Sequence, residues 1–261
     1  MKRRRFLASV LGAPAVGLGA SQDRAATGRE FYELRLYHLR VGPQDRAMHD
    51  FLRDVAIPAW NRAGVAPVGV FTVLFGLDRP TTYVLLPYRS LEMISTVAER
   101  LAGDDHYRQA AMAFLAAPAT SPAYVRAESS LMRAFATIPK LEVPPATAAK
   151  KPRIFELRTY ESPSDAAGLK KIEMFDTGEI AIFRRTGLTP VFFGQTLVGS
   201  RLPNLTYMLT YDDMAAREKN WAAFTADPEW KKLAATPGFT DPEIVSNISN
   251  AFLRPAPYSQ I

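Results

Sequence analysis

The 261-residue chain contains no cysteine, and its only histidines are His38, His49 and His106. Without cysteine, disulfides, thiolate metal sites, cysteine nucleophiles and a lipidated N-terminal cysteine are all excluded. So few histidines also argue against a histidine-rich metal site. The sequence has no glycine-rich phosphate loop, no G-x-S-x-G motif and no dinucleotide fingerprint. We therefore predict neither a metal site nor a bound cofactor.

An excess of one charge is also small once the N-terminus is set aside. The chain has 32 Lys and Arg against 26 Asp and Glu, a net charge of +6, but four of the basic residues lie at Lys2–Arg5. The other 28 give the rest of the chain a net charge of +2. This near-neutral body offers no electrostatic reason to expect a nucleic-acid partner. Hydrophobic residues make up 48% of the chain, a proportion typical of a folded globular protein.

A long hydrophobic run is missing as well. The apolar run Phe6–Ala20 is shorter than the ~20 residues that a membrane-spanning helix needs. Because this run follows a basic start, residues 1–20 are predicted to be a secretory signal peptide. The segment Arg3–Leu7 is similar to the R-R-x-F-L core of a twin-arginine signal, with Arg3 and Arg4 as the arginine pair. An ordinary Sec leader and a disordered basic start are the alternatives.

This interpretation of the leader predicts a location for the protein. We expect the twin-arginine export machinery to carry the chain, and the mature protein to be periplasmic or secreted. No later segment is long and apolar enough to suggest a stable membrane span.

A duplication organises the rest of the chain. Three segments recur at the same offset of 123 residues: Phe31–Tyr37 with Ile154–Tyr160, Gly64–Pro67 with Gly187–Pro190, and Asp104–Arg108 with Asp227–Lys231. Such self-similarity indicates two copies of one unit. The segment between them is rich in proline and is predicted to be an extended linker. We place the two domains at residues 29–136 and 153–255, with the linker at 137–152.

Each copy shows the same order of predicted elements, β-α-β-β-α-β, which is the ferredoxin-like split unit of an α+β fold. In each copy a strand with period-two alternation is followed by a helix that stops at Gly64 or Gly187. Pro58 is predicted to kink the first of these helices. The other predicted elements are strands 68–75, 82–86, 124–134, 191–198, 206–211 and 244–253, helices 90–101 and 213–224, and one extra helix in the first copy at 107–117.

The second copy resembles the NIPSNAP family. The strand Phe155–Tyr160, the pair Trp221 and Phe224, and the turn Asp227–Trp230 carry the resemblance. The first copy resembles it less, because Ala98 and Tyr107 stand where the second copy has tryptophan. The resemblance implies the dimeric α/β-barrel fold, in which two ferredoxin-like units join their sheets.

The resemblance implies little chemistry. The family has no settled biochemical activity, and related families of this fold include cofactor-free monooxygenases, haem enzymes and small-molecule isomerases, among which the fold does not decide. The two copies could close the barrel within one chain. Alternatively, each copy could pair with a copy from another chain, which would give a homo-oligomer.

Strand alternation separates the first strand of each copy into two faces. Leu34, Leu36 and Leu157 share one face, which we predict packs against the helices. The opposite face would then line the barrel interior and form a candidate ligand-binding site, made of Glu33, Arg35, Tyr37, Glu156, Arg158 and Tyr160. There, arginine would orient an anionic group, tyrosine would donate a hydrogen bond and glutamate would act as a base. The alternative is an interior ion-pair network that only holds the sheets together.

Three functions remain open at this point. The first is a small-molecule-binding protein or cofactor-free enzyme that uses the barrel interior. The second is a non-catalytic interaction or scaffold protein. The third is a haem or metal enzyme of the same fold, although His49 with Asp45 at helical i,i+4 spacing is the nearest approach to a ligand pair. Trp221 and Phe224 could be core residues or an aromatic wall at a pocket mouth.

Overall fold

The computed structural model describes residues 28–76 and 79–261. The predicted signal peptide, with Arg3 and Arg4, lies outside these residues. No helix in the described part of the chain is long and apolar enough to cross a membrane.

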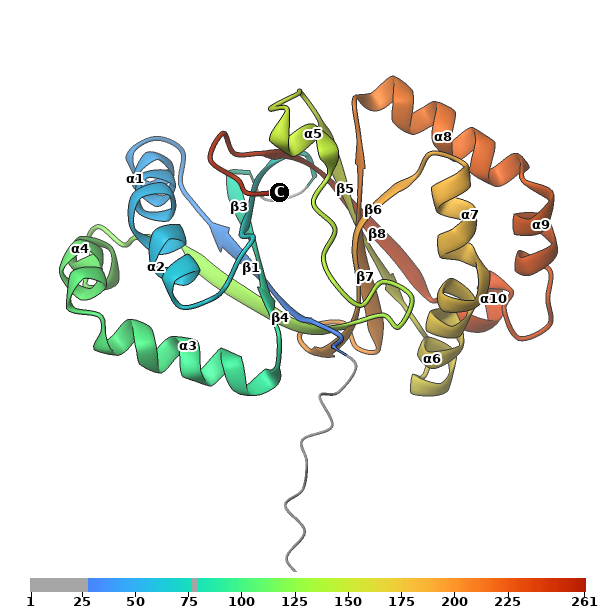
Figure 1. Ribbon diagram of the computed structural model, residues 1–261, viewed down its shortest axis with the longest axis horizontal. Coiled ribbons are helices and arrows are strands. Elements are labelled where there is room, and N and C mark those ends of the chain that lie inside the picture. The colour runs from blue at the N-terminus through green and yellow to red at the C-terminus, as the bar shows by residue number, and fades with distance from the viewer. Residues whose placement is uncertain (1–27, 77–78) are drawn as a thin grey trace, which may run out of the picture.

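Within the described residues, eight strands close into one barrel in the order β1-β3-β2-β8-β5-β7-β6-β4. Figure 1 shows the barrel at the centre of the molecule, with the helices of the two halves on opposite flanks. The predicted fold class is confirmed: each half contributes a β-α-β-β-α-β unit to a barrel of the dimeric α/β type. The strands are β1 (Phe31–His38), β2 (Gly69–Phe75), β3 (Thr81–Tyr88), β4 (Arg126–Ala134), β5 (Ile154–Glu161), β6 (Thr189–Val198), β7 (Asn204–Tyr211) and β8 (Asn247–Pro255).

The helices begin where the sequence supplies capping side chains. The side chains of Ser90, Ser164 and Asp213 each accept a hydrogen bond from the backbone N–H three residues later, as N-cap residues do. The helices are α1 (Pro43–Phe51), α2 (Ile57–Arg62), α3 (Leu91–Gly103), α4 (Asp105–Leu115), α5 (Pro145–Ala148), α6 (Asp165–Met174), α7 (Ile180–Arg185), α8 (Met214–Ala226), α9 (Pro228–Ala234) and α10 (Asp241–Ile244).

Several details of the helices differ from prediction, among them the unpredicted helix α10. A π-helical turn, η1 (Leu52–Ala56), separates α1 from α2, and its counterpart η2 (Phe175–Glu179) separates α6 from α7. Because the second half has Ala181 where the first has Pro58, proline is not the cause of the wide turn. The helix predicted only for the first copy, α4, has a shorter counterpart in α9. The predicted linker also contains the short helix α5.

The strand directions determine which loops share an end of the barrel. Neighbouring strands are antiparallel throughout the barrel. Four antiparallel steps lead from β1 to β5, so these two strands run in the same direction. The C-terminal ends of β1 and β5 therefore lie at one end of the barrel, together with the β2–β3 and β6–β7 turns.

The barrel interior is apolar, and the prediction for the two strand faces was wrong. Leu34 and Leu157 belong to the cluster that fills the barrel, and Leu36 packs against it. Tyr37 packs with the helices of the first half, and Tyr160 with those of the second. Alternation separates two faces but does not say which one the helices cover. Here the closed interior takes the leucines, because helix side chains can pair with the charged groups on the other face.

Candidate functional site

The six predicted site residues are divided between two separate networks, one under the helices of each half. Glu156 on β5 is the centre of the second-half network and is fully buried. Its carboxylate accepts hydrogen bonds from Arg158 (2.7 Å), Arg217 (3.1 and 3.2 Å), Asn250 (3.0 Å), Trp221 (3.1 Å) and Tyr211 (3.2 Å).

Those donors keep Glu156 ionised. Burial alone would raise its pKa, but the hydrogen bond from Arg217 and the charge of Arg158 lower the pKa to about 2. Arg158 also donates to the hydroxyl of Tyr160 at 3.1 Å. A carboxylate with this pKa and these donors is a poor general base and a good structural tie. Trp221 thus takes part in this network through its indole N–H.

The first-half network has fewer hydrogen bonds and is more exposed to solvent. Arg35 donates to both oxygens of Glu33, at 2.6 and 2.9 Å, and Tyr88 and Ser129 donate to the same carboxylate. The side chains of Glu33 and Arg35 are 13% and 30% exposed, against 0% for Glu156. The structure therefore joins each Glu–Arg pair but does not bring the two sets into one site.

A second buried ion pair lies only in the second half. Lys171 Nζ is 3.4 Å from Glu179 Oε2, and the two side chains are 1% and 2% exposed. The ammonium group lies 5.1 to 5.9 Å from the ring centres of Phe175, Tyr160 and Trp230. Burial raises the pKa of Glu179 to about 7, against the opposing charge of Lys171. This pair was not predicted from the sequence. The signal available was a difference between the copies: at the 123-residue offset, Met48 and Ala56 stand where the second half has Lys171 and Glu179.

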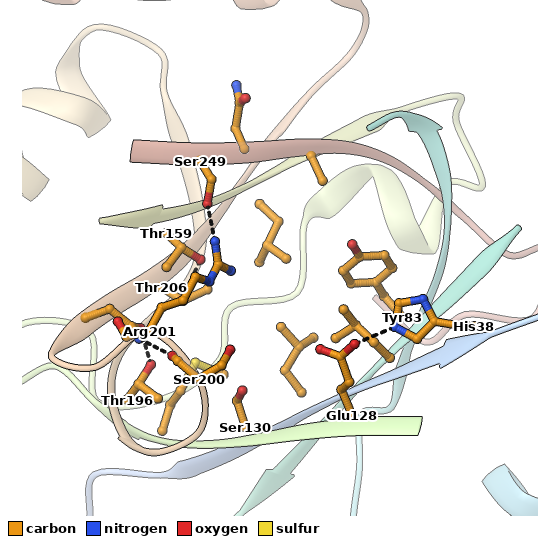
Figure 2. Close-up of a pocket in the computed structure, with 17 residues that line it drawn as sticks. His38, Tyr83, Glu128, Ser130, Thr159, Thr196, Ser200, Arg201, Thr206 and Ser249 are labelled. Carbon is orange, nitrogen blue, oxygen red and sulfur yellow. Dashed lines mark hydrogen bonds and ion pairs between the residues drawn. The ribbon is translucent and has the colours of Figure 1, made fainter. Parts of the chain in front are cut away.

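The open site of the barrel lies at the end where β1 and β5 finish. A cavity of about 250 Å³ is lined there by side chains from both halves, and we call it the barrel mouth. Its floor is the apolar barrel core, including Leu34, Leu36 and Leu157. Its walls carry polar side chains, which Figure 2 shows around the opening: His38, Glu128, Ser130, Thr159, Thr196, Arg201, Thr206 and Ser249.

One wall of the barrel mouth carries His38 and Glu128. His38 Nε2 lies 2.8 Å from Glu128 Oε1, and Arg126 Nε donates to the same oxygen at 2.9 Å. His38 is nearly buried, whereas the Glu128 side chain is 46% exposed. His38 lies on the same inward face of β1 as Leu36. Because that face was predicted to pack against the helices, His38 was not predicted to line a cavity.

The opposite wall carries Arg201, on the turn between β6 and β7. Its backbone has φ 58°, a left-handed conformation that a residue other than glycine seldom adopts. Asn204 holds this turn: its side-chain N–H groups donate to the carbonyls of Ser200 (2.9 Å) and Arg201 (3.0 Å). Thr196 in turn donates to Asn204 Oδ1 at 2.6 Å. Strained backbone of this kind persists where surrounding contacts hold it, often at functional sites.

The histidines do not form a metal centre. His49 Nε2 is 3.8 Å from Asp45 Oδ1, and its ring also contacts the Tyr258 hydroxyl. Within residues 28–76 and 79–261, no group of three or more His, Asp or Glu side chains is arranged to hold a metal ion.

Comparison with known proteins decides the family. A model of the NIPSNAP family matches residues 32–136 and 155–260. The chain belongs to the NIPSNAP family. The resemblance inferred from the sequence is thus confirmed, and this NIPSNAP protein carries the family domain twice. No curated protein matches the chain.

Solved structures support the fold. A putative monooxygenase from Fusobacterium nucleatum aligns with a TM-score of 0.56 at 9% identity, over 88% of this chain and 93% of that one. A putative monooxygenase from Lactobacillus acidophilus aligns with a TM-score of 0.55 at 8% identity, over 86% and 93% of the two chains. A NIPSNAP-like protein from Burkholderia xenovorans is 24% identical, with a TM-score of 0.36, over 40% of this chain and 85% of its own. At these identities the similarity to the two putative monooxygenases shows the fold alone.

Proposed function

We propose that this NIPSNAP protein is exported and binds a small polar molecule in the barrel mouth. The observation that carries the proposal is the composition of that cavity, which has an apolar floor and charged and hydroxyl side chains from both halves on its walls. Small-molecule sites combine an apolar lining with a few placed polar groups in the same way. The volume of about 250 Å³ is slightly below the usual range of ~300–1,000 Å³, so the ligand is small.

The two Glu–Arg networks support this choice by contrast. Both carboxylate oxygens of Glu156 accept hydrogen bonds from their neighbours, whereas Arg158 Nε is buried without a hydrogen-bond partner among the described residues. Neither residue lines the barrel mouth. A buried carboxylate whose oxygens already accept hydrogen bonds from the protein has a structural role and little capacity left for a ligand. Glu128 and Arg201, by comparison, have side chains that are 46% and 51% exposed at the opening, where a molecule from solvent can reach them.

The export part of the proposal rests on the N-terminal sequence. If the leader is a twin-arginine signal, replacing Arg3 and Arg4 together by lysine should abolish export although the charge is unchanged. The measurement is the fraction of protein that reaches the periplasm, followed by immunoblot, with Lys2→Arg as the charge-neutral control. Normal export of the double-lysine variant would favour a Sec leader instead.

The binding part is tested by filling the barrel mouth. Thr159 lies on the cavity wall, where its Oγ1 is 2.9 Å from Thr206 Oγ1. A Thr159→Phe substitution would occupy a large share of the cavity. Saturation-transfer NMR against a library of small polar fragments should give fragments that bind the unaltered protein and no longer bind Thr159→Phe. The exposed Thr225, on the outer surface of α8, provides a Thr→Phe control that should bind normally.

Each contrary outcome contradicts the proposal. Fragments that bind Thr159→Phe as well as the unaltered protein would place the site elsewhere. A library with no binding fragment would favour the interaction or scaffold function.

A further inference from the structure

We infer that the ligand of the barrel mouth is a small monocarboxylate with an apolar body, bound through Arg201. This inference rests on the binding function proposed above and adds the chemical class. It follows from the donors left on Arg201, the charge on the opposite wall and the size of the floor.

Arg201 has hydrogen-bonding capacity to spare. Its Nη1 donates to Ser249 Oγ at 3.0 Å and lies 3.4 Å from Glu161 Oε1. Its Nε and Nη2 make no hydrogen bond within the described part of the chain. A guanidinium has five N–H donors in a fork that matches a carboxylate. Figure 2 shows the Arg201 side chain reaching toward Ser249, on the opposite side of the pocket from His38 and Glu128.

The position of Arg201 is also fixed before a ligand arrives. Asn204, only 7% exposed, holds the two carbonyls of the turn, and Ser249 holds the guanidinium itself. The backbone of the turn is thus held before binding, and the hydrogen bond to Ser249 orients the guanidinium, which lowers the ordering cost of binding. A surface arginine without such support would not select a ligand geometry.

The opposite wall limits the ligand to one carboxylate. Glu128 presents a carboxylate whose Oε1 is occupied by His38 and Arg126, while its Oε2 makes no hydrogen bond within the described residues. An anionic group placed against Oε2 would meet the Glu128 carboxylate, whose charge Arg126 offsets in part from the other oxygen, and a hydroxyl would find an acceptor there. The two walls together therefore select a carboxylate at one end and a hydrogen-bond donor at the other.

The floor sets the size and character of the body between those ends. Leu34, Leu36 and Leu157 present apolar surface to the cavity. The volume of about 250 Å³ corresponds to roughly eight waters at ~30 Å³ each. A single six-membered ring with its substituents has this size. 4-Hydroxybenzoate carries all three features and is a suitable probe.

The first half supplies a matched control for Arg201. Arg79 lies in the corresponding β2–β3 turn, at the same end of the barrel. It directly precedes Pro80, as Arg201 lies two residues before Pro203. Its Nη1 donates to the carbonyl of Leu74 on the preceding strand β2 at 3.1 Å, and Arg79 does not line the barrel mouth. Arg79→Gln therefore removes the same charge from the same end without touching the site.

The experiment is a calorimetric titration of the unaltered protein, Arg201→Gln and Arg79→Gln with three probes. These are 4-hydroxybenzoate, the neutral 4-hydroxybenzyl alcohol and the dicarboxylate terephthalate. Loss of a charge-assisted pair should weaken 4-hydroxybenzoate by about 10- to 100-fold in Arg201→Gln and leave Arg79→Gln unchanged. The alcohol should bind both variants equally, and terephthalate should bind the unaltered protein more weakly than 4-hydroxybenzoate.

The outcomes separate this inference from the binding function. One set of results would show that the barrel mouth binds a ligand but that the carboxylate inference is wrong. In that case the alcohol binds as tightly as 4-hydroxybenzoate, Arg201→Gln has no effect on either probe, and Thr159→Phe blocks the binding of both. Equal affinity for terephthalate would overturn the limit to one carboxylate. Binding of 4-hydroxybenzoate that survives Thr159→Phe, or no binding of any probe, would overturn the inference outright, and the fragment library then tests the binding function independently.

Discussion

Replacing Glu156 by leucine should lower the free energy of unfolding by about 3–5 kcal/mol. The substitution leaves the Arg158 guanidinium, 13% exposed, without its carboxylate partner, and leaves Arg217, 18% exposed, with only the exposed carboxylate of Glu218. Uncompensated buried charge is among the few mechanisms that cost this much. Urea denaturation followed by circular dichroism measures the effect.

Glu33→Leu is the matched control in the first half. Arg35 is 30% exposed and can turn to water when Glu33 is lost, so we expect a loss of only about 1–2 kcal/mol. Equal losses of unfolding free energy in the two variants would contradict the contrast between a fully buried network and a partly exposed one.

Glu156 should also make the fold sensitive to acid. Because its pKa is lowered to about 2 from 4.5, its contribution to stability is present above pH 4.5. That contribution is lost as the pH falls from 4.5 toward 2 and the native carboxylate takes up a proton.

The second large effect concerns Lys171 and Glu179. Glu179→Met alone should destabilise the protein by about 3–5 kcal/mol at pH 8. Lys171 would be left buried among aromatic rings, with only the exposed Asp241 carboxylate 3.8 Å away. The double variant Lys171→Met with Glu179→Met should recover most of this loss, or exceed the stability of the unaltered protein. Well-packed apolar side chains of similar volume often replace a buried pair without loss. Met48 and Ala56, both fully buried, show that the same fold accepts apolar residues at these positions.

The pH dependence of stability provides a control for the Lys171–Glu179 prediction. The pKa of Glu179 is raised from 4.5 to about 7, so the native state retains a proton that the unfolded chain has already lost. Stability should therefore fall as the pH rises from 4.5 through about 7, where the native carboxyl loses its proton. The double variant should lack this fall. A double variant no more stable than Glu179→Met, or one with an unchanged pH profile, would show that the pair is not coupled in this way.

The two faces of β1 were separated correctly from the sequence but assigned to the wrong sides. Period-two alternation correctly grouped Glu33, Arg35 and Tyr37 on one face of β1, and Leu34 and Leu36 on the other. The assignment of those faces assumed that helices cover the more apolar one. In this protein both faces are covered, one by helices and one by the opposite wall of the barrel, so hydrophobicity alone could not choose between them.

The barrel mouth was missed for a related reason. Arg201 and Glu128 lie far apart in the chain, outside the matched segments of the repeat, and no motif joins them to His38. One signal was present in the repeat. At the 123-residue offset, His38 corresponds to Glu161, so the last residue of the first strand is polar in both copies. With the inward face assigned correctly, both residues would have pointed to this end of the barrel.

The amino-acid sequence by itself determined the elements and the duplication, because hydrophobic period, capping residues such as Ser164 and the glycine stops act locally. The constant offset then required two copies of one unit, and two such units have few ways to join their sheets. Only the tertiary structure decided which face of each strand is enclosed, because that depends on what packs against it from a distant segment. The structure also brought Arg201, Glu128 and His38 to one opening, since their proximity depends on the closure of the barrel.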